Sequence, residues 1–227
     1  MSDNMCENMC DAEKESARYY EILASEERHR TLNFLNLLSS VIKLKAGSYE
    51  SEEIRNFRDE IISLIESTSG VYTLITTAGT ETLSTDTFFL NITNSLNHFP
   101  HVREKKVKIK QVIQTLRLPG EYLLPLSLIT IESFTNSLKY AFPPDREGPH
   151  CFHIEFSHNN ESACLALRDN GIGPGTGGIR SEEHPGSGIT IMESLAGQLK
   201  GEIDLREEEG TLVELNFPIS TASRSSD

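Results

Sequence analysis

The sequence predicts an α+β protein in which an N-terminal helical hairpin, paired with a second copy as a four-helix bundle, precedes a sheet layer covered by helices. Apolar residues recur every three or four positions up to about residue 80, strands of period two follow, and glycine-rich loops interrupt the second half. We expect an acidic tail (1–16), the hairpin (17–80), an α/β-sandwich domain (81–220) and a C-terminal tail (221–227).

The hairpin is predicted from two apolar stripes. Leu32, Leu35, Leu38 and Ile42 mark one helical face within residues 18–44, and the pattern resumes from Ile54 to Ile75 after a break at Ala46-Gly47-Ser48. A lone hairpin cannot cover both stripes, so we expect a homodimer formed through the hairpin.

The helices and strands after residue 80 are predicted from a change in the spacing of the apolar residues. The predicted order is a helix near 88–99, a strand from 107 towards 116, a helix over 123–141, strands over 151–156 and 163–167, a helix over 188–199, and a closing hairpin of 203–205 with 213–217. This order predicts a sheet with helices on one face.

Composition excludes several classes of protein. The 227 residues carry 34 acidic and 21 basic side chains, and a formal charge of -13 repels the phosphate backbone of nucleic acid. No apolar run is long enough to span a bilayer, and the acidic N-terminus is unlike a signal peptide, so we expect a cytoplasmic protein without membrane insertion. The four cysteines are then expected to be free thiols, since Cys6 and Cys10 have no nearby partners that would complete a metal site.

Polar residues on the helix over 123–141 suggest a site. Glu132 and Asn136 are four residues apart and therefore share a helical face. A carboxylate beside an amide oxygen suits magnesium bound to a phosphate, and Lys139 one turn later can contact the phosphate. Taken alone, the same spacing is also typical of a solvent-facing polar stripe.

Two glycine clusters strengthen the prediction of a site. Asp169-Asn170-Gly171-Ile172-Gly173 leaves a strand in a sharp turn, where Asp169 can accept the exocyclic amine of adenine. Gly186-Ser187-Gly188 then opens a helix, whose free N–H groups favour an anion. Each cluster alone is a weak signal, but their order and spacing after Glu132 and Asn136 predict an ATP site.

These motifs resemble the N, G1 and G2 boxes of the GHKL (Bergerat) ATPase superfamily, which includes histidine kinases. The segment Glu26-x-x-His29-Arg30-x-x-Asn33 resembles the acceptor helix of histidine kinases of the HisKA_2 subfamily, which is close to the HWE kinases. Leu123-Leu124-Pro125 before Glu132 and Lys139-Tyr140-Ala141-Phe142-Pro143 after Asn136 fit the same subfamily. The resemblance spans about residues 20–218.

The resemblance implies a two-component histidine autokinase that uses ATP and Mg²⁺. His29 would accept the γ-phosphate and pass it to an aspartate of a response-regulator receiver, Asn136 would hold magnesium, and Asp169 would bind adenine. Glu132 would act near the γ-phosphate, and Glu26 would orient the histidine or accept its proton. The remaining nucleotide-binding positions implied are Lys139, Gly171, Gly173, Gly186, Gly188 and Thr211, with a lid over about 174–188.

The sequence differs from the subfamily pattern in two respects, and three other functions are compatible with it. Leu32 stands where the subfamily usually has a lysine, and fewer than thirty residues precede the acceptor helix, so we expect the signal to come from a separate sensor or input protein, from the acidic tail, or from a region absent here. The alternatives are a phosphotransfer protein with a non-catalytic ATPase-like domain, an anti-sigma-type serine kinase, and a scaffold that binds ATP only structurally. Nucleotide affinity and the phosphorylated residue separate them.

Overall fold

The computed structural model describes residues 26, 29–42, 44, 51–77, 82–99, 101–173 and 187–219. The predicted tails, the hairpin turn at 46–48, most of the predicted lid and Gly186 lie outside these residues. The chain divides into two compact units, residues 1–58 and 59–227.

The chain before residue 80 is helical where the apolar period predicts helices. Residues 29–42 are helical, and α2 runs over Glu52–Thr77, so that α2 begins in the first unit and continues in the second. Along the first helix four apolar side chains at successive steps of three, four and three residues are exposed to solvent: Phe34, Leu37, Val41 and Leu44. This is the spacing of a seam between helices. The dimeric four-helix bundle stays a prediction.

The second unit contains a five-stranded mixed sheet, which confirms the predicted α+β class. The elements in chain order are β1 (Thr82–Ser84), α3 (Thr85–Leu96), β2 (Lys108–Ile113), β3 (Arg117–Pro119), α4 (Gly120–Asn136), η1 (Ser137–Ala141), β4 (Cys151–His158), β5 (Ser162–Asp169), α5 (Ser187–Gln198), β6 (Glu202–Glu207) and β7 (Thr211–Pro218). The sheet order is β2-β4-β5-β7-β6, and only the β2 and β4 pair is parallel.

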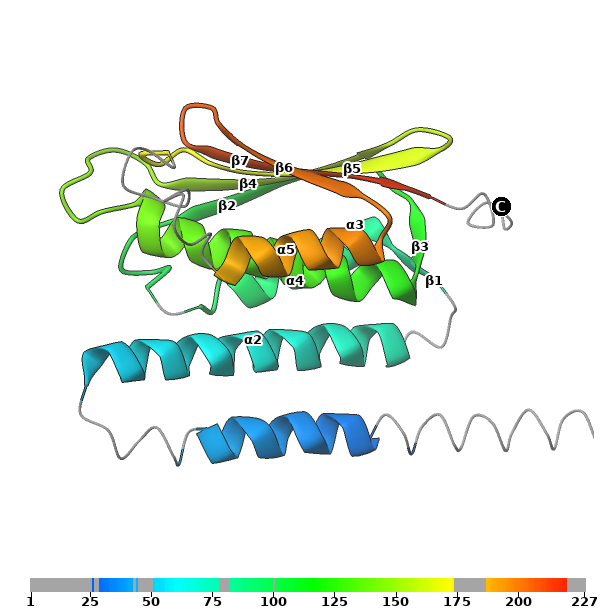
Figure 1. Ribbon diagram of the computed structural model, residues 1–227, viewed down its shortest axis with the longest axis horizontal. Helices are drawn as coiled ribbons and strands as arrows, with labels where there is room; N and C mark the ends of the chain where they lie inside the picture. The colour runs from blue at the N-terminus through cyan, green and yellow to red at the C-terminus, as the bar shows by residue number, and fades with distance from the viewer. Residues whose placement is uncertain are drawn as a thin grey trace, which may run out of the picture. The chain divides into compact units, whose positions relative to one another are not determined.

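Helices cover one face of this sheet (Figure 1). Figure 1 shows α3, α4 and α5 on the same side of the strands, in agreement with the alternation of fully buried and less buried residues in β4 and β5. Phe134 of α4 is fully buried and meets the ring of Phe152 of β4 edge to face, with ring centroids 5.0 Å apart. The apolar core therefore lies between the sheet and these helices, and it fixes α4 against the strand ends.

Two short strands were not predicted. β1 and β3 pair antiparallel, with Leu83 opposite Leu118, and they form a separate two-stranded sheet. The hydroxyl of Thr85 joins this region to the loop after β2, because it donates to Gln114 O at 2.9 Å and accepts from Leu116 N at 2.9 Å. Among the described residues, no helix is both long and apolar enough to cross a membrane.

Candidate functional site

The buried carboxylate of Asp169 is the centre of the candidate site. Asp169 ends β5 and is 2% exposed. Its Oδ1 accepts hydrogen bonds from Gly171 N at 2.9 Å and from Thr211 N at 3.1 Å, and its Oδ2 accepts from Ser137 Oγ at 2.7 Å. A buried charge needs such donors to offset the loss of water. The geometry brings together three predicted residues, namely Asp169, Gly171 and Thr211, and adds Ser137.

The turn after β5 lies tightly against the end of the helix over 120–141. A Cβ on Gly171 would lie 2.4 Å from both Cβ and O of Ala141, so a larger residue has no room there. Ile172 N donates to Ala141 O at 3.1 Å. Gly173 follows with a φ of +75°, which favours glycine. The predicted sharp turn after β5 is therefore present, and Gly171 lies close to Ala141 in it, whereas the expected approach of a base or a phosphate stays a prediction.

A second group of predicted residues meets at the start of α5. A Cβ on Gly188 would lie 2.1 Å from Glu132 Oε1 and 3.3 Å from Asn136 Nδ2. Glu132 and Asn136 lie on one face of α4, as their spacing predicts, and that face meets the first turn of α5. Ser137 follows Asn136 directly and bonds Asp169, so the two groups of residues are neighbours.

Asn170 and Arg146 hold the turn after Asp169, through contacts that the sequence analysis did not predict. The Asn170 amide accepts from Cys151 N at 2.8 Å and donates to Pro149 O at 2.8 Å, which ties the end of β5 to the start of β4. Arg146 donates to the Asn170 carbonyl, and its guanidinium lies 5.8 Å from the centroid of the Phe142 ring. Both residues hold the turn that follows Asp169.

Lys105 caps the helix that carries Asn136 and Ser137. Its ammonium donates to Leu138 O at 2.6 Å and to Phe142 O at 2.9 Å, at the end of η1. A cation at a helix C-terminus satisfies carbonyls that have no partner within the helix. Partial burial lowers the pKa of Lys105, and the neighbouring charge of Glu104 opposes this. These carbonyls are more than thirty residues away in the chain, so sequence reasoning did not find this contact.

We expect Lys105→Met to reduce the free energy of unfolding by about 1–3 kcal/mol, because two helix-end carbonyls lose a charged donor while the apolar stem is kept. Urea unfolding measures the change. The control is Lys110→Met, which replaces an exposed lysine on β2 and should stay within about 0.5 kcal/mol of the parent protein. Equal unfolding midpoints for the two variants would contradict the capping role.

The other predicted site residues are placed as follows. Lys139 is exposed one turn after Asn136, and Gly186 lies outside the described residues. His29 is exposed on the first helix of the N-terminal unit. The Glu26 carboxylate accepts from Arg30 at 2.5 Å, so its bond in the structure is to this arginine. The role predicted for Glu26 at the His29 ring stays untested.

The cysteines described here, Cys151 and Cys164, are free, as predicted for this part of the chain. Burial, followed by the nearby charges of Glu214 and Glu155, raises the pKa of the Cys164 thiol. A protonated thiol is a poor nucleophile and a poor metal ligand at neutral pH. Cys6 and Cys10 lie outside the described residues.

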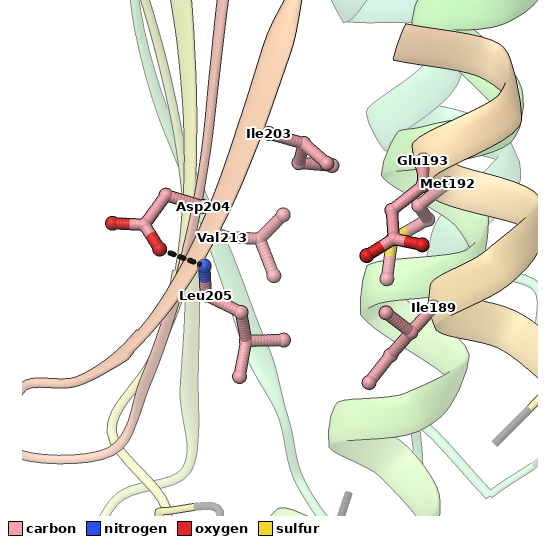
Figure 2. A pocket seen from close by; sticks show the side chains of 7 residues that line it. All are labelled: Ile189, Met192, Glu193, Ile203, Asp204, Leu205 and Val213. Atoms are coloured by element: carbon pink, nitrogen blue, oxygen red, sulfur yellow. Dashed lines mark hydrogen bonds between the residues drawn. The ribbon is translucent and has the colours of Figure 1, made fainter. Parts of the chain in front are cut away.

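An apolar cleft of about 140 Å³ lies between α5 and the sheet edge. Figure 2 shows Ile189, Met192 and Glu193 of α5 facing Ile203, Leu205 and Val213 of β6 and β7. Val213 is two residues beyond Thr211 on β7, so both side chains point to the same face of the sheet. The cleft therefore adjoins the end of the sheet that carries Asp169.

The residues fit a magnesium nucleotide. Asp169 offers an acceptor to an amine, Asn136 offers an amide oxygen to a hard cation, and the first turn of α5 offers backbone N–H groups to a phosphate. The described residues contain no cluster of three or more His, Cys, Asp or Glu able to hold a metal.

The fold is similar to that of solved histidine kinases. One is the histidine kinase domain of the blue-light-activated histidine kinase EL346 from Erythrobacter litoralis, with a TM-score of 0.61 and 20% identity over 89% of this chain and 94% of that domain. The longer EL346 structure gives a TM-score of 0.60 and 19% identity over 86% of this chain, which spans 60% of that chain. No protein-family model and no curated protein sequence matches. At this identity the similarity shows that the chain has the fold of a histidine kinase domain.

Proposed function

We propose that the chain is an ATP-dependent protein histidine kinase of the HisKA_2 or HWE-like type with a GHKL-type ATPase domain. It transfers the γ-phosphate of ATP to His29 and then to an aspartate of a response-regulator receiver. The observation that carries the proposal is the buried Asp169 carboxylate, held by three donors in a histidine kinase fold next to the Glu132, Asn136 and Gly188 group. A buried acceptor beside a helix N-terminus and a carboxylate-amide pair matches the three chemical parts of a magnesium nucleotide.

Each part of the site has a role in this proposal. Asp169 accepts the exocyclic amine of adenine, the first turn of α5 binds phosphate, and Asn136 holds Mg²⁺ with Glu132 near the γ-phosphate. The metal, when bound, neutralises phosphate charge and so lowers the barrier to nucleophilic attack. The chain contributes by positioning the reacting groups and by stabilising the phosphate charge, because phosphoryl transfer requires little covalent chemistry from the protein.

His29 is the proposed nucleophile because it is an exposed imidazole on a helix with the acceptor-helix motif. A neutral ring nitrogen attacks the γ-phosphorus in line, the N–P bond forms as the bond to the bridging oxygen breaks, and ADP leaves with the electron pair. The ring proton passes to solvent. Arg30, next to His29, is already paired with Glu26 and holds that carboxylate one turn before the imidazole.

The proposed homodimer is supported by the exposed seam on the first helix. Phe34 and Leu37 are 59% and 60% exposed, Leu44 is 79% exposed, and Phe57 on α2 is 63% exposed. Large apolar side chains at heptad spacing stabilise helix pairing when they are buried. Light scattering tests this proposal, and a mass of one chain, 25.4 kDa, at micromolar concentration would contradict it.

Paired labelling reactions test the proposed activity. The protein is incubated with Mg²⁺ and either γ-labelled or α-labelled ATP, and the label bound to denatured protein is counted. We expect label from γ-labelled ATP only, because phosphoryl transfer moves only the terminal group. Equal label from both would indicate bound nucleotide or nucleotidyl transfer, and folded protein without label from either would count against autokinase activity.

Gly188→Ala should reduce labelling at least about tenfold, because the new Cβ would displace the Glu132 carboxylate from the start of α5. Only a flexible side chain must move, so we expect little loss of stability. The matched control is Gly197→Ala in the same helix, where the added Cβ meets nothing within 4 Å. This control should keep its labelling and gain about 0.5–1 kcal/mol from helix propensity. Unchanged labelling in Gly188→Ala would rule out a role for this contact.

A further inference from the structure

Ser137 makes the only side-chain hydrogen bond to the carboxylate of Asp169 among the bonds that the described residues show. Its Oγ lies 2.7 Å from Asp169 Oδ2, and both residues are buried, at 4% and 2% exposure. The two other donors, Gly171 N and Thr211 N, are backbone groups, and both reach Oδ1. The three donors come from η1, the turn after β5, and β7, so they fix the carboxylate from three sides.

The hydrogen bonds to Asp169 use most of the acceptor positions of its carboxylate. A carboxylate has about four acceptor positions, two on each oxygen. Gly171 N and Thr211 N occupy both positions on Oδ1, and the Ser137 hydroxyl occupies one of the two on Oδ2. Among the described residues no further donor reaches this carboxylate, so they leave one acceptor position, on Oδ2. An amine can donate to it, whereas the carbonyl oxygen of a 6-oxopurine cannot.

The Ser137 hydroxyl has two possible acceptors and one proton. Ser133 O lies 3.1 Å away, one turn earlier in the same helix, and Asp169 Oδ2 lies 2.7 Å away. The charged acceptor makes the shorter and stronger bond, so the proton belongs to the carboxylate. The position of Ser137 on a capped helix thus decides which lone pair of Asp169 Oδ2 stays open.

We propose that Ser137 is a specificity-determining residue: it holds Asp169 so that a single acceptor position faces the nucleobase, and it thereby sets the preference for a 6-aminopurine. The inference rests on the proposed nucleotide site and deepens it. Without the hydroxyl, the described residues leave two positions on Oδ2 open and hold the carboxylate at one oxygen only. Water then competes with the amine, and the contribution of the amine to binding falls.

A double-mutant cycle between protein and ligand tests this role. Dissociation constants are measured by calorimetry with Mg²⁺ for ATP and for purine riboside triphosphate, which lacks only the 6-amino group. The proteins are the parent chain, Ser137→Ala and Ser137→Cys, which keeps the side-chain bulk but donates weakly. The control is Ser133→Ala, which removes another buried hydroxyl from the same helix, one turn earlier.

We expect the parent chain to bind ATP about tenfold or more tightly than the analogue, as a hydrogen bond to a charged group provides. In Ser137→Ala and Ser137→Cys this ratio should fall to about twofold, whereas Ser133→Ala should keep it. If Ser137→Ala does not fold, the comparison is made with Ser137→Cys, which leaves no cavity.

Other outcomes overturn the inference in distinguishable ways. If the Ser137 variants bind both nucleotides more weakly by the same factor, so that the ratio of the two affinities is unchanged, Ser137 has only a packing role. A parent chain that binds both nucleotides equally would show that Asp169 does not accept the amine, with nucleotide binding intact. A folded parent chain that binds neither nucleotide would overturn the proposed function itself, and this inference with it.

Discussion

His29→Ala abolishes the label from γ-labelled ATP, lowering it at least about a hundredfold to background, because alanine offers no nitrogen to the γ-phosphorus. His29 is exposed on the helix before α2, whereas the candidate nucleotide site is built from α4, η1, α5 and the strand ends. The variant should therefore bind Mg·ATP within about twofold of the parent chain. Labelling and calorimetry on the same preparation measure both quantities.

The control for this prediction is His98→Ala, which removes another exposed histidine and should leave the labelling unchanged. Labelling that survives in His29→Ala at the parent rate would mean that another residue is the acceptor. Loss of both labelling and ATP binding would instead indicate that the substitution damages the fold.

Asp169→Asn weakens ATP binding roughly a hundredfold, since removing the charge from a buried hydrogen-bonded site costs about 2–5 kcal/mol. An asparagine keeps one oxygen acceptor and presents an amide NH₂ in place of the other. Its oxygen can serve Gly171 N and Thr211 N, and the NH₂ then points at the place of the amine, donor against donor. Calorimetric titration with Mg·ATP gives the affinity, and thermal unfolding shows whether the variant is folded.

Asp86→Asn is the matched control, because Asp86 is an exposed aspartate in the first turn of α3. We expect its ATP affinity to equal that of the parent chain. If Asp169→Asn folds and binds ATP with the affinity of the parent chain, the nucleotide does not bind at Asp169.

Features that depend on a single helix, strand or turn are predicted well from the sequence. Glu132 and Asn136 are one helical turn apart, so their shared face follows from the helix period, and the structure places both at Gly188. The apolar residues alternate in strands β4 to β7 and recur every three or four positions in helices α3 to α5. This pattern is clear enough to locate each element within a few residues. The glycine turn after Asp169 is likewise readable, because only glycine tolerates the contact that Gly171 makes with Ala141.

Contacts between segments that are distant in the chain are predicted poorly from the sequence. Ser137 and Asp169 are 32 residues apart, and Lys105 lies 33 and 37 residues from the carbonyls that it caps. Only the packing of α4 on the sheet creates these bonds, and no local period encodes them. β1 and β3 contain three residues each, which is too few for an alternation to be recognised. The parallel pairing of β2 with β4 is also a property of topology rather than of either strand.

The most direct test of the proposed activity is the chemical stability of the phosphoryl label on the parent chain. The protein is labelled from γ-labelled ATP with Mg²⁺, denatured, and divided between acid and alkali. We predict label that survives alkali and is lost in acid, as a phosphorus-nitrogen bond on an imidazole requires. Label that survives acid and is lost in alkali would identify a serine or threonine ester, and would contradict the proposal that this chain is a histidine kinase.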